Sequence, residues 1–337
     1  MSVEYPLVPA RLLACLKAPG DATEAPLVAG PDGYLATEDG QYRFDGVNGV
    51  HSLYADPPDN RQDVTKKVRS FYEENPFPNY EGIEEYGDLV RKGNRNPFSR
   101  SLLNAIGYNK LVLECGCGTG QLGQYLQLNN NHVLSIDMTL SSLRLANDYK
   151  RSQKLTRNAF IQMNIFNMGI RDESFDVAIA HGCLHHTFDA RRAFAEVSRK
   201  VKPGGFVVVG LYNAYARIPT WIRARLIGLL GPKIDYVVRN RIQAQHKAHI
   251  WIQDQYYNPH ETWHTIDEVL NWIHENDLEY INCVPAILDT HGENAGDLFD
   301  RTDPGTVYQR IVTQMGWLGT IAREGALFDV IARKPDR

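Results

Sequence analysis

Residues 111–120 read Leu-Val-Leu-Glu-Cys-Gly-Cys-Gly-Thr-Gly, an apolar run of strand length that ends in three closely spaced glycines. Glycine backbones turn tightly and let a ligand approach without meeting a Cβ atom. A helix-length stretch follows at 121–127. The next apolar run, 132–136, ends at Asp137, and a carboxylate at the tip of a neighbouring parallel strand can accept two ribose hydroxyls. This part of the chain predicts a nucleotide-binding strand–loop–helix unit.

The same alternation continues along the chain. Apolar runs alternate with periodic stretches of helix length, which is typical of βαβ units and of a parallel sheet buried on both faces. Further strands are expected at 159–163, 175–180, 206–211, near 281–288 and at 326–332, and helices at 63–74, 140–153, 190–200 and 265–276. A turn is expected at 201–205, where Pro and two Gly precede a strand. The sequence thus predicts an α/β fold.

Three regions are expected in the 337 residues, enough for one large α/β domain with additions. Residues 1–60 are rich in Pro, Gly and Asp and predict a small, irregular β-rich module. Residues 61–108 are expected to form a helical linker that covers the ligand pocket. Residues 109–337 form the main domain, in which 213–262 is predicted to be a helical lid insertion.

Composition excludes several classes of protein. Hydrophobic residues make up 43% of the chain and the formal charge is −4, which argues against a disordered chain and a strongly basic nucleic-acid coat protein. No apolar run approaches the length of a membrane span, and the N-terminus lacks the pattern of a signal peptide. The five cysteines include no C-x-x-C pair, so neither a disulfide scaffold nor a four-cysteine zinc site is expected. We expect a cytoplasmic protein.

The glycine loop alone leaves two interpretations open. Gly118, Gly120 and Gly123, with Asp137 further on, also satisfy the fingerprint of a dinucleotide site. However, Glu114 precedes the loop and suits a ligand with an ammonium group better than a pyrophosphate. No P-loop motif is present, which excludes that class of NTPase. A dinucleotide oxidoreductase therefore ranks last.

The segment from about 110 to 211 resembles the core of class I S-adenosylmethionine-dependent methyltransferases, in the broad methyltransferase type 11 group. The matching pieces are Glu-Cys-Gly-Cys-Gly-Thr-Gly at 114–120, Ser-Ile-Asp-Met at 135–138, Phe-Asp-Val-Ala-Ile-Ala-His-Gly-Cys-Leu-His-His-Thr at 175–187 and Val-Lys-Pro-Gly-Gly at 201–205. The resemblance implies a Rossmann-like, seven-stranded sheet whose last strand is antiparallel. It also implies S-adenosylmethionine as the cofactor.

The resemblance further implies where this cofactor binds. Its methionine and ribose part would pack on the glycine loop, with Glu114 near the amino group, directly or through water. The residues implied for this part are Glu114, Gly116, Cys117, Gly118 and Gly120.

The tips of the neighbouring strands would hold the remaining parts of the cofactor. Asp137 would take the ribose and Met138 would lie against adenine. Asn164, followed by Ile165, stands where the family usually has an Asp, and its amide oxygen and nitrogen can still serve adenine. The backbone at His181 would face the methionine end.

The sulfonium methyl is already activated, so the enzyme's main tasks are alignment and exclusion of water. His186 is our first choice for a base or acceptor-orienting group, and His181 is the second, because imidazole titrates near neutral pH. Predicted acceptor contacts are Tyr80, His185, Tyr212, Asn213, Tyr256 and His260. The clustered histidines have no carboxylate nearby, so no metal is expected.

The acceptor itself is not specified by any motif. The Asn-Pro-Pro-Tyr signature of some amino methyltransferases is absent, which favours a small molecule methylated on oxygen or carbon. Residues 213–250 carry seven Lys and Arg against one Asp, which suits an anionic or lipid-like acceptor, or peripheral contact with a membrane. The same segment motivates one alternative, an RNA (tRNA) methyltransferase. A second alternative is a non-catalytic cofactor-binding subunit.

The N-terminal flank carries a weaker resemblance. Residues 11–54 loosely resemble the zinc-ribbon-like module that precedes some of these methyltransferases, but only Cys15 remains of its paired cysteines. We therefore expect a degenerate module without metal. The aromatic residues of 71–80 are expected to cover the cofactor pocket.

Overall fold

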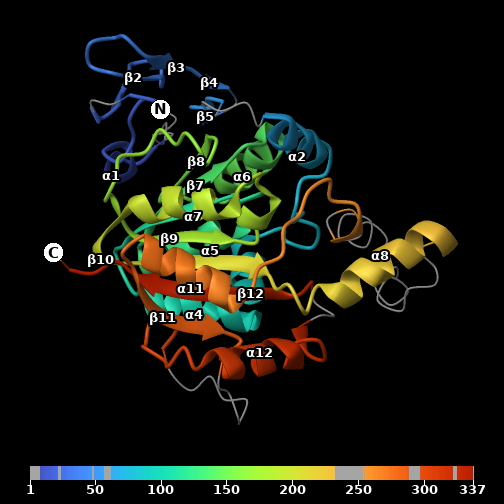
Figure 1. Ribbon diagram of the computed structural model, residues 1–337. Helices are drawn as coiled ribbons and strands as arrows, with labels where there is room; N and C mark the ends of the chain where they lie inside the picture. Colours follow the sequence, from blue (N-terminus) through green and yellow to red (C-terminus); the bar gives the residue numbers. More distant parts are fainter. Residues whose placement is uncertain are drawn as a thin grey trace.

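The computed structural model describes residues 8–21, 24–47, 49–56, 62–231, 253, 255–287, 297–321 and 325–336. In this part of the chain a nine-stranded sheet has the order β11-β12-β10-β9-β6-β7-β8-β5-β4 (Figure 1). Its strands are β4 (Gly46–Val47), β5 (Val50–Ser52), β6 (Leu111–Cys115), β7 (His132–Asp137), β8 (Asn158–Gln162), β9 (Phe175–His181), β10 (Val201–Tyr212), β11 (Glu279–Val284) and β12 (Leu327–Arg333).

The predicted Rossmann-like methyltransferase fold is confirmed. Strands β8, β7, β6, β9 and β10 are parallel neighbours, and β12 lies antiparallel between β10 and β11. The carboxyl ends of β6, β7, β8 and β9 therefore meet at one edge, where a ligand can contact several strand tips at once.

Two strands extend the seven-stranded sheet that the resemblance implied. β5 pairs in parallel with β8 through His51 and Ser52, and β4 pairs antiparallel with β5. They come from the N-terminal 60 residues and cover a sheet edge whose backbone groups need partners. The same region also forms a separate three-stranded antiparallel sheet of β1 (Val28–Ala29), β2 (Leu35–Ala36) and β3 (Arg43–Phe44).

Helices cover both faces of the large sheet. One core contains Leu113, Leu134 and Ala178 packed with Phe194 and Trp272, and the other contains alternate residues of the same strands. Figure 1 shows α7 and α11 across one face. The helices are α1 (Ala10–Leu13), α2 (Gln62–Glu74), α3 (Tyr86–Arg95), α4 (Pro97–Ile106), α5 (Gln121–Leu126), α6 (Leu140–Ser152), α7 (Ala190–Arg199), α8 (Ile218–Leu230), α11 (Ile266–Glu275) and α12 (Val307–Gly316), with 3-10 turns η1 (Gln127–Asn129) and η2 (Leu184–His186).

The turn expected at 201–205 lies inside a strand. β10 begins at Val201, and its pairing with β9 shifts register between Val201 and Phe206. Gly204 has a φ of 77° within this irregular stretch. The Pro-Gly-Gly sequence thus makes a bulge that the strand pairing tolerates, rather than a break before the strand.

The predicted lid insertion is described only in part. Its first helix is α8, and its basic residues Lys233, Arg239, Arg241 and Lys247, with Asp235, lie outside the described residues. Among the described helices, none is long and apolar enough to cross a membrane.

Candidate active site

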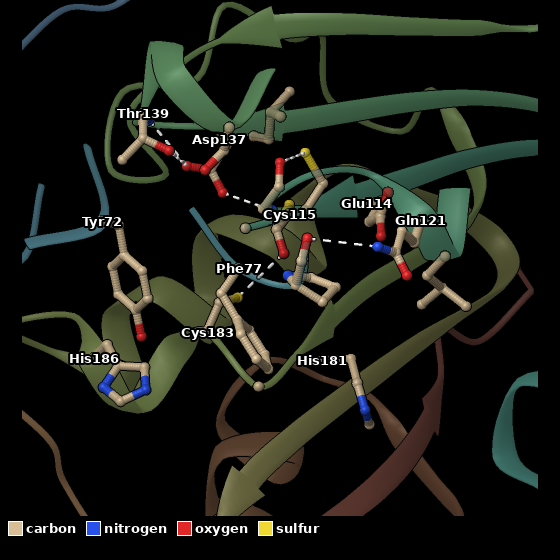
Figure 2. A pocket seen from close by; sticks show the side chains of 18 of the residues that line it. Tyr72, Phe77, Glu114, Cys115, Gln121, Asp137, Thr139, His181, Cys183 and His186 are labelled. Atoms are coloured by element: carbon tan, nitrogen blue, oxygen red, sulfur yellow. Dashed lines mark hydrogen bonds between the residues drawn. The ribbon is translucent and has the colours of Figure 1, made fainter. Parts of the chain in front are cut away.

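A cavity of about 570 Å³ opens at the carboxyl ends of β6, β7 and β9. Figure 2 shows its side chains, with Asp137 and Thr139 at one side, Tyr72 and His186 at another, and His181 across from them. Its lining includes nine of the ten residues predicted to bind the cofactor, all except Gly120: Glu114, Gly116, Cys117, Gly118, Asp137, Met138, Asn164, Ile165 and His181.

The glycine loop needs glycine because two other segments press on it. A Cβ atom at Gly116 would lie 2.4 Å from the Cβ of Cys183, and one at Gly118 would lie 2.1 Å from the carbonyl oxygen of Phe77. Both glycines also have positive φ, of 65° and 52°. The loop is therefore clamped between the tip of β9 and the segment that contains Phe77.

Asp137 is held in place by groups on both sides of it. Its Oδ1 accepts hydrogen bonds from the backbone N and the hydroxyl of Thr139, at 2.9 and 2.7 Å, and its Oδ2 accepts one from Gly118 N at 2.8 Å. Burial raises the pKa of this carboxyl, and these three donors oppose that shift. The carboxylate keeps further lone pairs with which it can accept ligand hydroxyls.

Glu114 lies at the root of the loop and is 5% exposed. Its Oε2 accepts a hydrogen bond of 2.6 Å from the Ser135 hydroxyl. Burial raises the pKa of Glu114 to about 7, against the opposing effect of Ser135. A ligand ammonium group nearby would favour the ionised form, because an opposite charge offsets the cost of burial.

Asn164 presents an unusual buried group at the tip of β8. Its Oδ1 accepts a hydrogen bond from Phe166 N at 3.0 Å. Its Nδ2 is buried and makes no hydrogen bond with the described part of the protein, although Tyr54 lies within interaction range of this residue. A buried amide hydrogen without a partner is costly, so this donor fits an acceptor atom on a bound ligand such as an adenine ring nitrogen.

His186 lines the other end of the cavity, on η2. Its Nδ1 donates to the backbone carbonyl of His260 at 2.8 Å. The neutral ring then carries its proton on Nδ1 and its lone pair on Nε2. In Figure 2 the Tyr72 hydroxyl points toward this imidazole, and the same hydroxyl accepts a hydrogen bond from Asn258 Nδ2 at 2.8 Å.

His181 is paired with a carboxylate from another strand. Its Nδ1 lies 2.7 Å from Asp329 Oδ1, and Phe98 stacks on the ring at a centroid distance of 4.6 Å. Burial lowers the pKa of His181, but the charge and hydrogen bond of Asp329 outweigh it, so the net pKa is raised. The imidazole at this end is therefore biased toward its charged form.

Gly120 and five of the predicted acceptor contacts lie outside the cavity lining, while Tyr212 belongs to it. Gly120 precedes α5 and packs beneath the loop against Phe160. Tyr80 supports the loop from behind, since its hydroxyl donates to Thr119 O at 2.6 Å. His260 contacts His186 through its carbonyl, as described above, and its Nε2 lies 3.1 Å from Thr187 O.

The remaining predicted contacts are packed into the surrounding structure. His185 is fully buried and stacks on Tyr212 at 3.8 Å, and burial holds its pKa well below the ordinary value. Asn213 is fully buried and donates to Gln314 at 2.9 Å. Tyr256 is half-buried in the C-terminal part of the predicted lid insertion.

Several residues that line the cavity or support its lining escaped the sequence analysis. Lys92 lines the cavity and donates to Gln121 Oε1 at 2.6 Å, and Phe98 covers His181. Asp329 offered a signal, because it is the one acidic residue within the otherwise apolar run 326–332. Lys92 offered none, because a lysine on an amphipathic helix is usually a solvated residue.

Comparison with known proteins finds similarity in the part of the chain that carries most of this site. Residues 113–209 match the family model described as a methyltransferase domain. An uncharacterized protein of Synechococcus sp. is 24% identical over 262 residues, which make up 68% of this chain and 62% of that protein. A malonyl-[acyl-carrier protein] O-methyltransferase of Hamiltonella defensa is 28% identical over 97 residues, 29% of this chain and 36% of that protein.

A third relative has a different kind of acceptor. A tRNA (carboxymethyluridine(34)-5-O)-methyltransferase of Arabidopsis thaliana is 30% identical over 122 residues, 35% of this chain and 28% of that protein. The chain thus spans less than two thirds of the length of each of these curated relatives.

The family match runs from β6 to β10 and includes the glycine loop, Asp137 and His181. The last strand of the sheet, β12, is antiparallel as the resemblance implied, and the loop and strand tips line one cavity. The chain therefore contains a class I methyltransferase domain, of the family that uses S-adenosylmethionine as the methyl donor.

Proposed function

We propose that the protein transfers a methyl group from S-adenosylmethionine to a small, largely apolar acceptor bound in the same cavity. The observation that carries this proposal is the shared cavity itself. The glycine loop, Asp137 and Asn164 line one part of it, and Tyr72 and His186 line another. A donor and an acceptor held side by side react as if in one molecule, which removes most of the entropic barrier.

The residues fit the chemical groups of this cofactor. Glu114 suits the ammonium of its methionine end, and Lys92 supplies a cation for the carboxylate beside it. Asp137 suits the ribose hydroxyls and Asn164 Nδ2 suits a ring nitrogen of adenine. When bound, S-adenosylmethionine supplies an activated methyl group on a sulfonium sulfur.

His186 is proposed as the base. Because its Nδ1 donates to His260 O, its Nε2 can take a proton from an acceptor hydroxyl, directly or through Tyr72. Proton removal leaves an acceptor oxygen with the electron pair that forms the new bond to carbon. His181, paired with Asp329, is the alternative acceptor-orienting group at the opposite side.

The acceptor is proposed to be apolar because of what lines the remaining space. Val68, Leu89, Phe98 and Tyr125 contribute apolar surface, and Tyr72 and Gln255 add isolated polar groups. Such a lining favours a ring or hydrocarbon body with one reactive polar group.

Isothermal titration with S-adenosylmethionine and with its demethylated product tests the cofactor half of the proposal. We expect heat with both ligands, and folded protein that releases heat with neither would overturn it. Incubation of the protein with labelled methyl donor and a cell extract tests the acceptor half, with the labelled product located by mass.

An RNA acceptor is a second candidate, favoured by the tRNA methyltransferase among the relatives. Arg217 does not support it, because this side chain is fully buried and paired with Glu261 at 2.6 Å. If the protein binds bulk tRNA and the binding weakens steeply as salt rises, this candidate is favoured. If the labelled methyl group appears in small molecules and not in RNA, this candidate is rejected.

A further inference from the structure

Helix α8 carries an apolar face that points away from the protein. Figure 1 shows the helix extending from the body of the molecule beyond the end of β10. Its inward side consists of Thr220 and Ile227, which are buried, whereas Leu229 is 80% exposed and Leu230 is 67% exposed. Ordinary surface helices bury their apolar residues and expose polar ones.

The exposed residues form a continuous stripe. Ile218, Ile222, Arg225 and Leu229 follow one another at intervals of four, three and four, which places them on one side of a helix. Trp221 and Leu226 flank the stripe and are also exposed. An exposed apolar surface of this extent marks a site of contact with a partner or a lipid surface.

The charges on α8 are all of one sign. The helix contains Arg223 and Arg225 and no acidic residue. The Arg225 guanidinium lies 4.6 Å from the centre of the Trp221 ring, within the exposed face. A partner of this face must therefore accept apolar side chains and a cation together.

A second copy of the helix does not meet that requirement. Packed against another α8, Arg225 would enter an apolar seam in which the helices offer no carboxylate, and an unpaired buried charge is strongly unfavourable. At the surface of an anionic bilayer the apolar residues enter the acyl boundary, the guanidinium reaches lipid phosphates, and an indole takes its preferred interfacial place.

We propose that α8 docks the protein on an anionic lipid surface. The docking rests on α8 alone and does not depend on the proposed methyl transfer. The helix starts next to Arg217, which binds Gln255 Oε1 at 2.6 Å, and Gln255 lines the cavity. Docking would therefore hold the cavity mouth near the membrane, where an apolar acceptor dissolves.

Co-sedimentation of the full chain with vesicles tests this proposal. Vesicles of phosphatidylcholine with phosphatidylglycerol are expected to bind the protein, more weakly as salt rises, and vesicles of phosphatidylcholine alone are expected to bind it less. Leu229→Glu should weaken binding by at least about tenfold, and Arg225→Gln by about fivefold. Tyr108→Glu is the control, because Tyr108 is 69% exposed elsewhere on the surface and should leave binding unchanged.

Trp221 provides a second measurement. Brominated lipids should quench part of the tryptophan fluorescence of the wild type, and Trp221→Phe should remove that part. Equal vesicle binding by the wild type and Leu229→Glu, with both folded by circular dichroism, would overturn the proposal. A wild-type dimer that Leu229→Glu converts to a monomer, without vesicle binding, would overturn it in favour of a second copy.

Discussion

His181 on β9 and Asp329 on β12 form an ion pair of 2.7 Å across the strand that separates them. That strand is β10, and the residue beneath the pair is Gly210. A Cβ atom there would lie 2.6 Å from Asp329 Oδ1 and 2.8 Å from His181 Nδ1. The ion pair thus requires glycine at this position of β10. The pair connects the tip of the parallel strand β9 to the antiparallel strand β12.

Replacing Asp329 by Asn should lower the pKa of His181, because the carboxylate raises it against the effect of burial. Histidine NMR titration measures this directly, and an unchanged pKa would contradict the assignment of the pair. The pKa of His181 is higher in the folded protein than in the unfolded chain. The ion pair therefore stabilises the folded state fully below the unfolded imidazole pKa of about 6.5, and this stabilisation is lost as the pH rises through the pKa of the folded state. The cost of Asp329→Asn in free energy of unfolding, about 1–3 kcal/mol, should therefore shrink at alkaline pH.

Gly118→Ala should weaken S-adenosylmethionine binding by at least about tenfold, because the new Cβ has no room beside Phe77 O and the backbone has positive φ. Titration calorimetry measures the affinity. Gly107→Ala is the matched control, since Gly107 has a φ of 73° but nothing within 4 Å of its Cβ position. Equal loss of affinity in both variants would show that backbone strain alone, and not the closeness of Phe77, causes the effect.

Cofactor affinity should rise with pH around the Glu114 pKa of about 7. Below that pH the carboxyl is neutral, and above it the ionised form attracts the ligand ammonium. Glu114→Gln should bind more weakly at alkaline pH and show a flatter profile. Ser135→Ala should move the midpoint upward, because the Ser135 hydroxyl lowers this pKa. A wild-type affinity that is constant across this range would contradict the proposed ammonium contact.

His186→Asn should lower kcat by about a hundredfold or more and leave cofactor affinity unchanged, if the acceptor must lose a proton to the imidazole. His274→Asn on the exposed side of α11 is the control and should behave as wild type. An unchanged kcat in His186→Asn would contradict the role of His186 as the base.

The strand tips were predictable because their pattern is local. An apolar run followed by glycines, or by Asp137, predicts a strand and the loop after it. The rules for consecutive βαβ units then place the carboxyl ends of these strands at one edge of the sheet. This is why nine of the ten predicted cofactor residues line the cavity. The addition of β4 and β5 to the sheet was not predictable, because a two- or three-residue strand carries no periodicity.

The acceptor side depended on tertiary structure. His185 and His186 are adjacent and identical in sequence, yet His185 is buried against Tyr212 and His186 lines the cavity. The 3-10 turn η2 decides this, since it directs successive side chains to different sides. Asp329 and Phe98 likewise reach His181 from strands and helices far away in the chain.

The amino-acid sequence by itself determined the alternation of the central strands and helices and the glycine loop, because these depend on the spacing of residues within one segment. The resemblance of its motifs to a known family implied the nucleoside cofactor. Only the tertiary structure decided which histidine lines the cavity, which carboxylate supports His181 and which face of α8 remains exposed. Those outcomes depend on contacts between segments far apart in the chain, and no local spacing encodes them.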